Sequence, residues 1–229
     1  MSIGTDIHSH ILPAIDDGSQ SVEMSLDILR GLESLGYTRI WTTPHISYLY
    51  PNDKNTIRAA FDSVEEAAGE AGINIELHYA AEYMFDDNFV NNLYKQDDLL
   101  TLPNKHLIIE FSMQSEPIIF YKDILFDLQM RGYRLILAHP ERYLYFHNSF
   151  SIYEELKRSG ILFQVNLLSL SGYYGKPIKK MAEKFVKRYM IDLLGTDIHH
   201  PDQLKLLQQP KLIKTVNNIR YKNDFPDFI

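Results

Sequence analysis

Short apolar runs alternate with longer amphipathic segments along this chain. Seven of the runs have the length and composition of strands and cover residues 3–11, 38–44, 73–82, 105–111, 133–139, 161–166 and 191–197. Segments between them carry apolar residues at helical spacing and end on glycine, a common C-terminal cap; one such series is Met24, Ile28, Leu32 and Leu35 before Gly36. This alternation predicts a parallel sheet with right-handed crossovers.

Seven strands in 229 residues predict an α/β fold that closes, or nearly closes, into a barrel. A doubly wound open sheet is the second choice. The length fits one large domain over residues 1–229, and 45% hydrophobic residues suffice for its core. We find no linker, internal repeat or low-complexity segment.

Polar side chains stand at or near the ends of most of these apolar runs. They are His8, His10, His45, Glu82, Glu110, His139, Asp197 and His199. The carboxyl ends of parallel barrel strands converge on one face, which carries the active site. Buried charges need partners, so a ring of imidazoles and carboxylates there predicts bound metal ions.

The H-x-H spacing supports this interpretation. Residues i and i+2 of a strand point to the same face, so His8 and His10 can both reach one metal ion. Asp16 and Asp17 follow in a loop that can fold back over the site. Imidazoles and carboxylates without thiolates suit Mn²⁺, Fe²⁺ or Zn²⁺. We expect structural roles for the remaining histidines, which are His78, His106, His147 and His200.

Composition narrows the function classes. A net charge of −7 and a pI of about 5.7 argue against a nucleic-acid or anionic-membrane surface, without excluding a local basic patch. The sequence shows no run of 18 apolar residues and no secretory signal, which predicts a soluble, cytoplasmic protein. The absence of cysteine excludes a thiolate nucleophile.

Seven motifs occur in order across nearly the whole chain: DIHSHILPAIDDG, TPH, AAEY, IIEF, AHPERY, QVN and GTDIH. Together they resemble the PHP superfamily, named for polymerase and histidinol phosphatase domains. Within it, the pattern is similar to the metal-dependent protein-tyrosine phosphatases of bacterial capsular and exopolysaccharide loci. The resemblance implies a distorted (β/α)7 TIM-like barrel with three divalent metal ions, most often Mn²⁺, with Fe²⁺ or Zn²⁺ as alternatives.

The resemblance also implies roles for individual residues. The first metal would be held by His8, His10, Glu82 and Asp197, the second by bridging Glu82 with Glu110 and His139, and the third by Asp17, His45 and His199. The implied catalytic residues are Arg142, which would bind the phosphate, with Asp197 and His199. Many superfamily relatives carry histidine at Asp17 and Glu110, so the carboxylates favour the tyrosine-phosphatase branch. Lys205 is the candidate for a second phosphate-binding cation.

The implied reaction is hydrolysis of phosphotyrosine by metal-activated hydroxide, and the implied partner is an autophosphorylating tyrosine kinase that controls polysaccharide export. Aromatic residues after several strands, in ISYLYP, at Tyr83, in RYLYF and in SGYYG, could form a rim for the phosphotyrosine ring. The alternatives are a small-molecule phosphatase such as a histidinol phosphatase, or a non-catalytic metal-binding PHP module. An amidohydrolase ranks low, because the middle strand lacks the metal-bridging lysine typical of that family.

Overall fold

The computed structural model describes residues 4–93, 99–221 and 223. It is a mixed α/β fold in which every strand pairing is parallel. The strands are β1 (Thr5–Asp6), β2 (Arg39–Thr42), β3 (His45–Ile46), β4 (Glu76–Tyr79), β5 (Glu82–Met84), β6 (His106–Glu110), β7 (Arg134–Ala138), β8 (Leu162–Asn166) and β9 (Leu193–Gly195). Their pairing gives the orders β1-β2-β4 and β3-β5-β6-β7-β8-β9. The predicted alternation of parallel strands and helices is confirmed.

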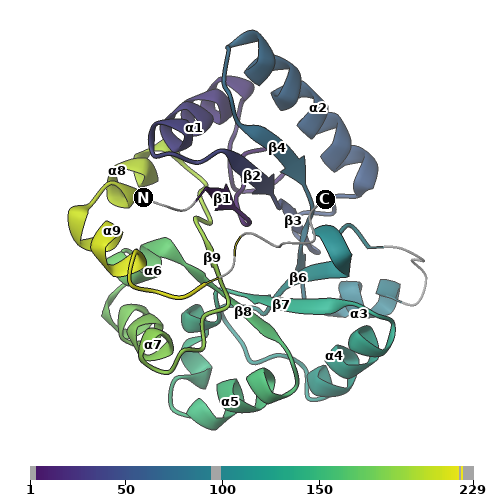
Figure 1. Ribbon diagram of the computed structural model, residues 1–229. Helices are drawn as coiled ribbons and strands as arrows, with labels where there is room; N and C mark the ends of the chain where they lie inside the picture. Colours follow the sequence, from purple (N-terminus) through teal and green to yellow (C-terminus); the bar gives the residue numbers. More distant parts are fainter. Residues whose placement is uncertain (1–3, 94–98, 222, 224–229) are drawn as a thin grey trace.

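The helices lie outside the strands (Figure 1). They are α1 (Val22–Ser34), α2 (Lys54–Glu70), α3 (Asp87–Leu93), α4 (Tyr121–Met130), α5 (Phe150–Arg158), α6 (Leu167–Ser171), α7 (Lys176–Lys187), α8 (Leu204–Leu207) and α9 (Pro210–Val216). Short 3₁₀ turns are η1 (Pro103–Lys105), η2 (Pro140–Arg142), η3 (Leu144–Phe146) and η4 (Pro201–Gln203). Ser21 caps α1 by accepting a hydrogen bond from the Met24 amide. No helix in the described residues is long and apolar enough to cross a bilayer.

The two sheets are joined at both sides. The chain passes twice from the first sheet into the second, from β2 into β3 and from β4 into β5. Between these two crossings, the Glu82 amide donates a hydrogen bond to the Pro44 carbonyl oxygen at 3.1 Å. Beyond the ends of β1 and β9, Ser9 forms a parallel bridge with Ile198. The strand segments therefore follow one another around the centre of the molecule, with the helices around them (Figure 1).

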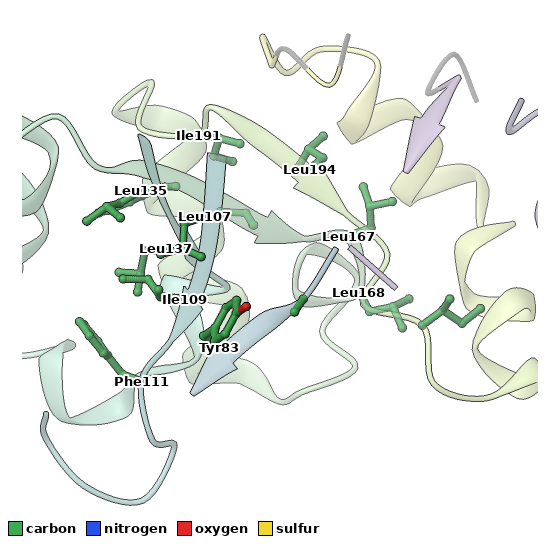
Figure 2. Close-up of a cluster of buried hydrophobic side chains, with 14 of the residues drawn as sticks. Tyr83, Leu107, Ile109, Phe111, Leu135, Leu137, Leu167, Leu168, Ile191 and Leu194 are labelled. Atoms are coloured by element: carbon green, nitrogen blue, oxygen red, sulfur yellow. The ribbon is translucent and has the colours of Figure 1, made fainter. Parts of the chain in front are cut away.

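Alternate residues of the central strands pack in two directions. Leu107 and Ile109 of β6 join the cluster that contacts the helices (Figure 2), whereas Ile108 joins a second cluster with Ile7 and Ile136. Burial on both faces explains why these strands read as continuous apolar runs. Each fully buried aliphatic side chain stabilises the fold by about 1.5–3 kcal/mol. Glu110 follows Ile108 at the same strand period, so its side chain continues the inward face.

Candidate metal centre

The structure brings together all nine residues that the sequence suggested as metal ligands. His8 and His10 stand just past β1, and their Nε2 atoms are 3.2 Å apart. Oε2 of Glu82, at the start of β5, lies 3.1 Å from Nε2 of His8 and 3.4 Å from Nε2 of His10. Oδ1 of Asp197 lies 3.6 and 3.4 Å from the same two nitrogens. This is the first group that the resemblance implied.

Glu82 also reaches a second group. Its Oε1 is 3.1 Å from Nε2 of His139, and its Oε2 is 3.1 Å from Nδ1 of His45. Glu110 approaches the same histidines, with Oε1 2.9 Å from Nδ1 of His45 and Oε2 3.7 Å from Nε2 of His139. Glu82 therefore has the central position expected of a bridging carboxylate.

Asp17 forms the outer edge of the cluster. Its Oδ1 lies 3.4 Å from Nε2 of His45 and 3.6 Å from Nε2 of His199. The rings of His199 and His10 stack with their centroids 4.1 Å apart. The Asp17 side chain is 55% exposed, whereas those of His10 and Glu82 are fully buried. The third group thus opens toward solvent.

Metal ions fit these groups. Ligand atoms within 4.8 Å of one another occur in three sets: His8, His10 and Glu82; His45, Glu82 and Glu110; and His10, Asp17, His45 and His199. Two nitrogens each about 2.1 Å from one ion stand roughly 3–3.4 Å apart, which matches the spacing of His8 and His10. Nδ1 of His45, Oε2 of Glu82 and Oε1 of Glu110 are buried and make no hydrogen bond within the described residues. Such buried polar atoms need a partner, and an ion bound between them would supply it.

The cluster is strongly charged in the absence of an ion. Burial opposes the charge on Glu82, but His8 and His45 beside it hold its pKa well below the usual range. Burial likewise opposes protonation of His10, yet Asp16 and other carboxylates raise its pKa well above the usual value. Metal binding would therefore displace protons from these imidazoles.

Asp16 orients His10 and the backbone of His45 through hydrogen bonds. Its Oδ2 accepts from Nδ1 of His10 at 2.9 Å and from the His45 amide at 3.1 Å. The Gly18 amide donates to Oδ1, and a Cβ on Gly18 would lie 2.2 Å from the His10 carbonyl oxygen. Only glycine fits this close loop. Carboxylates that fix the tautomer of a ligand histidine are common at metal sites.

Gln164 performs the same task for His8, and the sequence interpretation missed it. Its Oε1 accepts from Nδ1 of His8 at 2.8 Å, while its Nε2 donates to Oδ1 of Asn166 at 2.9 Å. Nδ2 of Asn166 donates to Oδ2 of Asp197. A Cβ on Gly195 would lie 2.7 Å from Nε2 of Gln164, so this glycine makes room for the network. The sequence did offer one signal for this contact. Gln164 and Asn166 are amide residues two positions apart in β8, and residues at this spacing in a strand point to the same face.

Arg142 lies at the mouth of the cluster. Its Nη1 donates to Oδ2 of Asp197 at 3.0 Å, and its guanidinium carbon lies 4.5 Å from the centre of the Tyr174 ring. The side chain is 24% exposed. Arg142 lines a cavity of about 540 Å³ together with six residues of the candidate centre. The other lining residues include Leu49, Tyr50, Met84, Met113, Tyr173 and Tyr174.

The backbone adopts an unusual conformation just after two of the strands. His139 has φ 34° and Asp197 has φ 50°, in the left-handed region that L-residues other than glycine rarely adopt. Such conformations cluster at functional sites, where the surrounding structure stabilises them. Here they turn both side chains into the shared cluster as the chain leaves β7 and β9.

Two of the aromatic residues suggested for the rim do not lie there, and the residue before Arg142 is also buried. Glu141 accepts from the Asn166 amide and from Ser169 Oγ, whereas Arg142 pairs with Asp197. Tyr83 and Tyr143 are core residues rather than rim residues, with 3% and 0% exposure.

The prediction that Lys205 is a second phosphate-binding cation is wrong. Its side chain is 82% exposed, pairs with Asp202 and does not line the cavity.

The four histidines assigned structural roles lie outside the cluster. His78 stacks on Trp41 and contacts Glu76. Nδ1 of His106 lies 2.7 Å from the Pro103 carbonyl oxygen, Nε2 of His147 lies 2.8 Å from that of Glu141, and His200 caps η4. Their structural interpretation is confirmed.

Comparison with known proteins shows the family. Residues 4–225 match the family described as capsular polysaccharide synthesis, CpsB/CapC. The chain is 29% identical over 206 residues to the tyrosine-protein phosphatase CpsB of Streptococcus pneumoniae, covering 86% of this chain and 83% of that protein. It is also similar to a chain from the crystal structures of YwqE from Bacillus subtilis and CpsB from S. pneumoniae, which are described as unique metal-dependent tyrosine phosphatases. The TM-score is 0.80 and the identity is 29%, over 87% of this chain and 81% of the other.

A more distant structure, the histidinol phosphate phosphatase of Lactococcus lactis complexed with zinc, L-histidinol and phosphate, matches with a TM-score of 0.55 at 14% identity, over 95% and 94% of the two chains. This likeness concerns the fold alone. The match over residues 4–225 confirms the resemblance to the capsular tyrosine phosphatases. The chain belongs to the CpsB/CapC family of capsular polysaccharide synthesis proteins.

Proposed function

We propose that this protein is a metal-dependent protein-tyrosine phosphatase, a phosphoric monoester hydrolase. The observation that carries the proposal is the convergence of nine imidazole and carboxylate residues in one cluster, six of which line the same cavity as Arg142. The named activity of relatives that are 29% identical over most of the chain supports it.

Three divalent ions, most often Mn²⁺ in the resembling family, would occupy the three groups described above. Fe²⁺ and Zn²⁺ are the alternatives, because the donors are nitrogen and oxygen. Bound divalent ions supply Lewis acidity and make hydroxide available from water near neutral pH. The ligand assignment is that of the sequence, with Glu82 shared between the first and second ions and Asp17, His45 and His199 holding the third.

Arg142 would hold the phosphoryl oxygens. Its guanidinium is fixed on one side by Asp197 and on one face by Tyr174, so its remaining N–H groups are presented with little loss of entropy. A planar guanidinium binds phosphate oxygens in pairs and counters the charge that develops in the transition state. Asp197 and His199 complete the catalytic set, Asp197 by linking Arg142 to the first group and His199 by facing the open third group. A phenol leaving group has a pKa of about 10 and needs less protonation than an alkyl alcohol.

The remaining expectations stay proposals. One domain over residues 1–229 is supported by the family match over 4–225. A distorted (β/α)7 barrel is supported by the circular order of the strand segments and the bridge between Ser9 and Ile198. A cytoplasmic location and a tyrosine kinase as substrate follow from the sequence and the resemblance.

A substrate screen tests the proposal. The metal-loaded protein is assayed for phosphate release from a phosphotyrosine peptide, a phosphoserine peptide and histidinol phosphate. We expect the phosphotyrosine peptide to have the highest kcat/KM. Preference for histidinol phosphate would indicate the small-molecule phosphatase, and full metal loading without turnover of any substrate would indicate a non-catalytic module.

A further inference from the structure

Helix α7 carries an excess of positive charge that the catalytic site does not use. Its twelve residues include five lysines and one glutamate, in a chain whose net charge is −7. By contrast, α1 and α2 each carry two more acidic than basic residues. The local basic patch that the overall composition left open is therefore on α7.

Three of these lysines form one exposed row, which we term the basic face of α7: Lys176, Lys180 and Lys187. At about 100° per residue these three lysines lie within roughly 40° of one another around the helix axis, and the exposed Glu183 lies about 20° from Lys176 in the same row, so the row carries three positive charges and one negative charge. The opposite side, at Met181, Ala182 and Phe185, is buried against the core. Among the described residues, no carboxylate lies within ion-pair distance of these three lysines.

The two other lysines of α7 are occupied locally. Nζ of Lys179 donates to the Ser171 carbonyl oxygen, and Nζ of Lys184 lies 3.6 Å from the centre of the Phe150 ring. These contacts hold Lys179 and Lys184 against their own fold. The basic face is thus the part of α7 whose charge remains available to a partner.

The basic face begins at the mouth of the catalytic cavity. Tyr173 and Tyr174 line the cavity, Gly175 is the N-cap of α7, and Lys176 follows directly. Helix α7 also packs against η2, which carries Arg142. From Lys176 to Lys187 the helix rises about 16 Å, a span that an extended peptide covers in about five residues.

We propose that the basic face of α7 binds an acidic segment of the phosphotyrosine substrate, within a few residues of the phosphotyrosine. The proposal rests on the proposed function and adds the class of sequence that the enzyme selects. Unpaired cations in a row attract acidic side chains, and opposite charge accelerates encounter in a salt-dependent way. A protein with net charge −7 otherwise repels an acidic phosphopeptide, so a local positive track would set where such a peptide approaches.

The test compares two phosphotyrosine peptides, one flanked by Glu and Asp and one by Gln and Asn, with a small aryl phosphate as reference. The variant is Lys176→Glu/Lys180→Glu/Lys187→Glu. The matched control, Arg30→Glu/Arg58→Glu/Lys214→Glu, changes net charge equally on α1, α2 and α9. We expect the wild type and the control to prefer the acidic peptide by about tenfold in kcat/KM at low salt, with the preference falling as salt is added. The α7 variant should lose that preference and keep its aryl phosphate turnover.

Equal turnover of both peptides by the wild type, or an acidic preference that survives in the α7 variant, would overturn the proposal. So would binding of the wild type to phosphatidylserine vesicles, lost in the α7 variant, without any peptide preference, because the face would then contact a membrane. Absence of turnover with all three substrates would reject the phosphatase assignment itself, which separates that failure from failure of the basic face.

Discussion

Oε1 of Gln164 accepts a hydrogen bond from Nδ1 of His8 at 2.8 Å, on the ring nitrogen opposite the one that faces Glu82. This contact fixes which nitrogen of His8 is presented to the cluster. It also connects His8 through Asn166 to Asp197 and Arg142. The amides of β8 therefore join the first metal group to Arg142, the residue proposed to bind the phosphate.

Replacement of Gln164 should weaken metal binding. Gln164→Leu removes the acceptor and should lower the affinity for the added metal ion by about 10- to 100-fold. Gln164→Glu keeps an acceptor for His8 and should retain most of the affinity. Isothermal titration of the metal-free variants with Mn²⁺ measures this. Equal affinities for Gln164→Leu and wild type would show that the contact does not orient His8.

The adjacent residues Asp16 and Asp17 should differ in their effects on metal-free stability and on metal content. Asp16 is buried and holds His10, the His45 amide and the Gly18 amide, so Asp16→Ala should lower the free energy of unfolding of the metal-free protein by about 1–3 kcal/mol. Asp17 is half-exposed at the third group, so Asp17→Ala should lower metal content and turnover with little change in that free energy. Urea unfolding with chelator and elemental analysis test the pair. A large loss of metal-free stability in Asp17→Ala would mark it as a structural residue.

Arg142 should act on catalysis without holding metal. Arg142→Ala should keep the metal content and lose about 3–4 kcal/mol of transition-state stabilisation, or roughly a hundredfold or more in rate on a phosphotyrosine peptide. Arg142→Lys should recover part of the rate, because an ammonium lacks the planar fork. His8→Ala is the contrasting variant and should lose metal and activity together. Near-normal turnover in Arg142→Ala would reduce Arg142 to a salt bridge with Asp197.

A buried carboxyl outside the ligand set predicts a pH dependence. Burial raises the pKa of Asp6 to about 6 from 3.8, despite hydrogen bonds from Thr196 and the His8 amide that lower it. A raised pKa in the folded state means that stability is greatest where Asp6 is protonated and falls as pH rises from about 4 to about 6. Relative to Asp6→Asn, the metal-free wild type should therefore lose up to roughly 3 kcal/mol across this range. Urea unfolding of both proteins from pH 4 to 7.5 measures the difference, and a constant difference would contradict it.

The sequence predicted the alternation of parallel strands with helices and the convergence of ligands because both follow from local patterns. Apolar runs buried on two faces identify strands, and polar residues at their ends must then meet on one face. The alternation argument for His8 and His10 reached the right result although regular β1 pairing covers Thr5–Asp6 and the histidines lie beyond it.

What the sequence could not supply depends on three-dimensional neighbours. Gln164 lies 156 residues from His8, and no local pattern marks their contact. Glu141 and Tyr143 flank a site residue, yet a turn at η2 sends both into the core. Side-chain direction in such turns is set by backbone angles, here the left-handed His139, which residue types do not reveal.

The central claim is that metal ions held by this cluster hydrolyse phosphotyrosine, and one assay tests it most directly. Phosphate release from a phosphotyrosine peptide is measured after chelator treatment and again while Mn²⁺ is titrated back, with bound metal determined at each point. We predict no turnover in the metal-free protein and recovery of activity as bound metal approaches three ions per chain. Turnover that persists without metal, or no turnover at full occupancy of an intact fold, would contradict the claim.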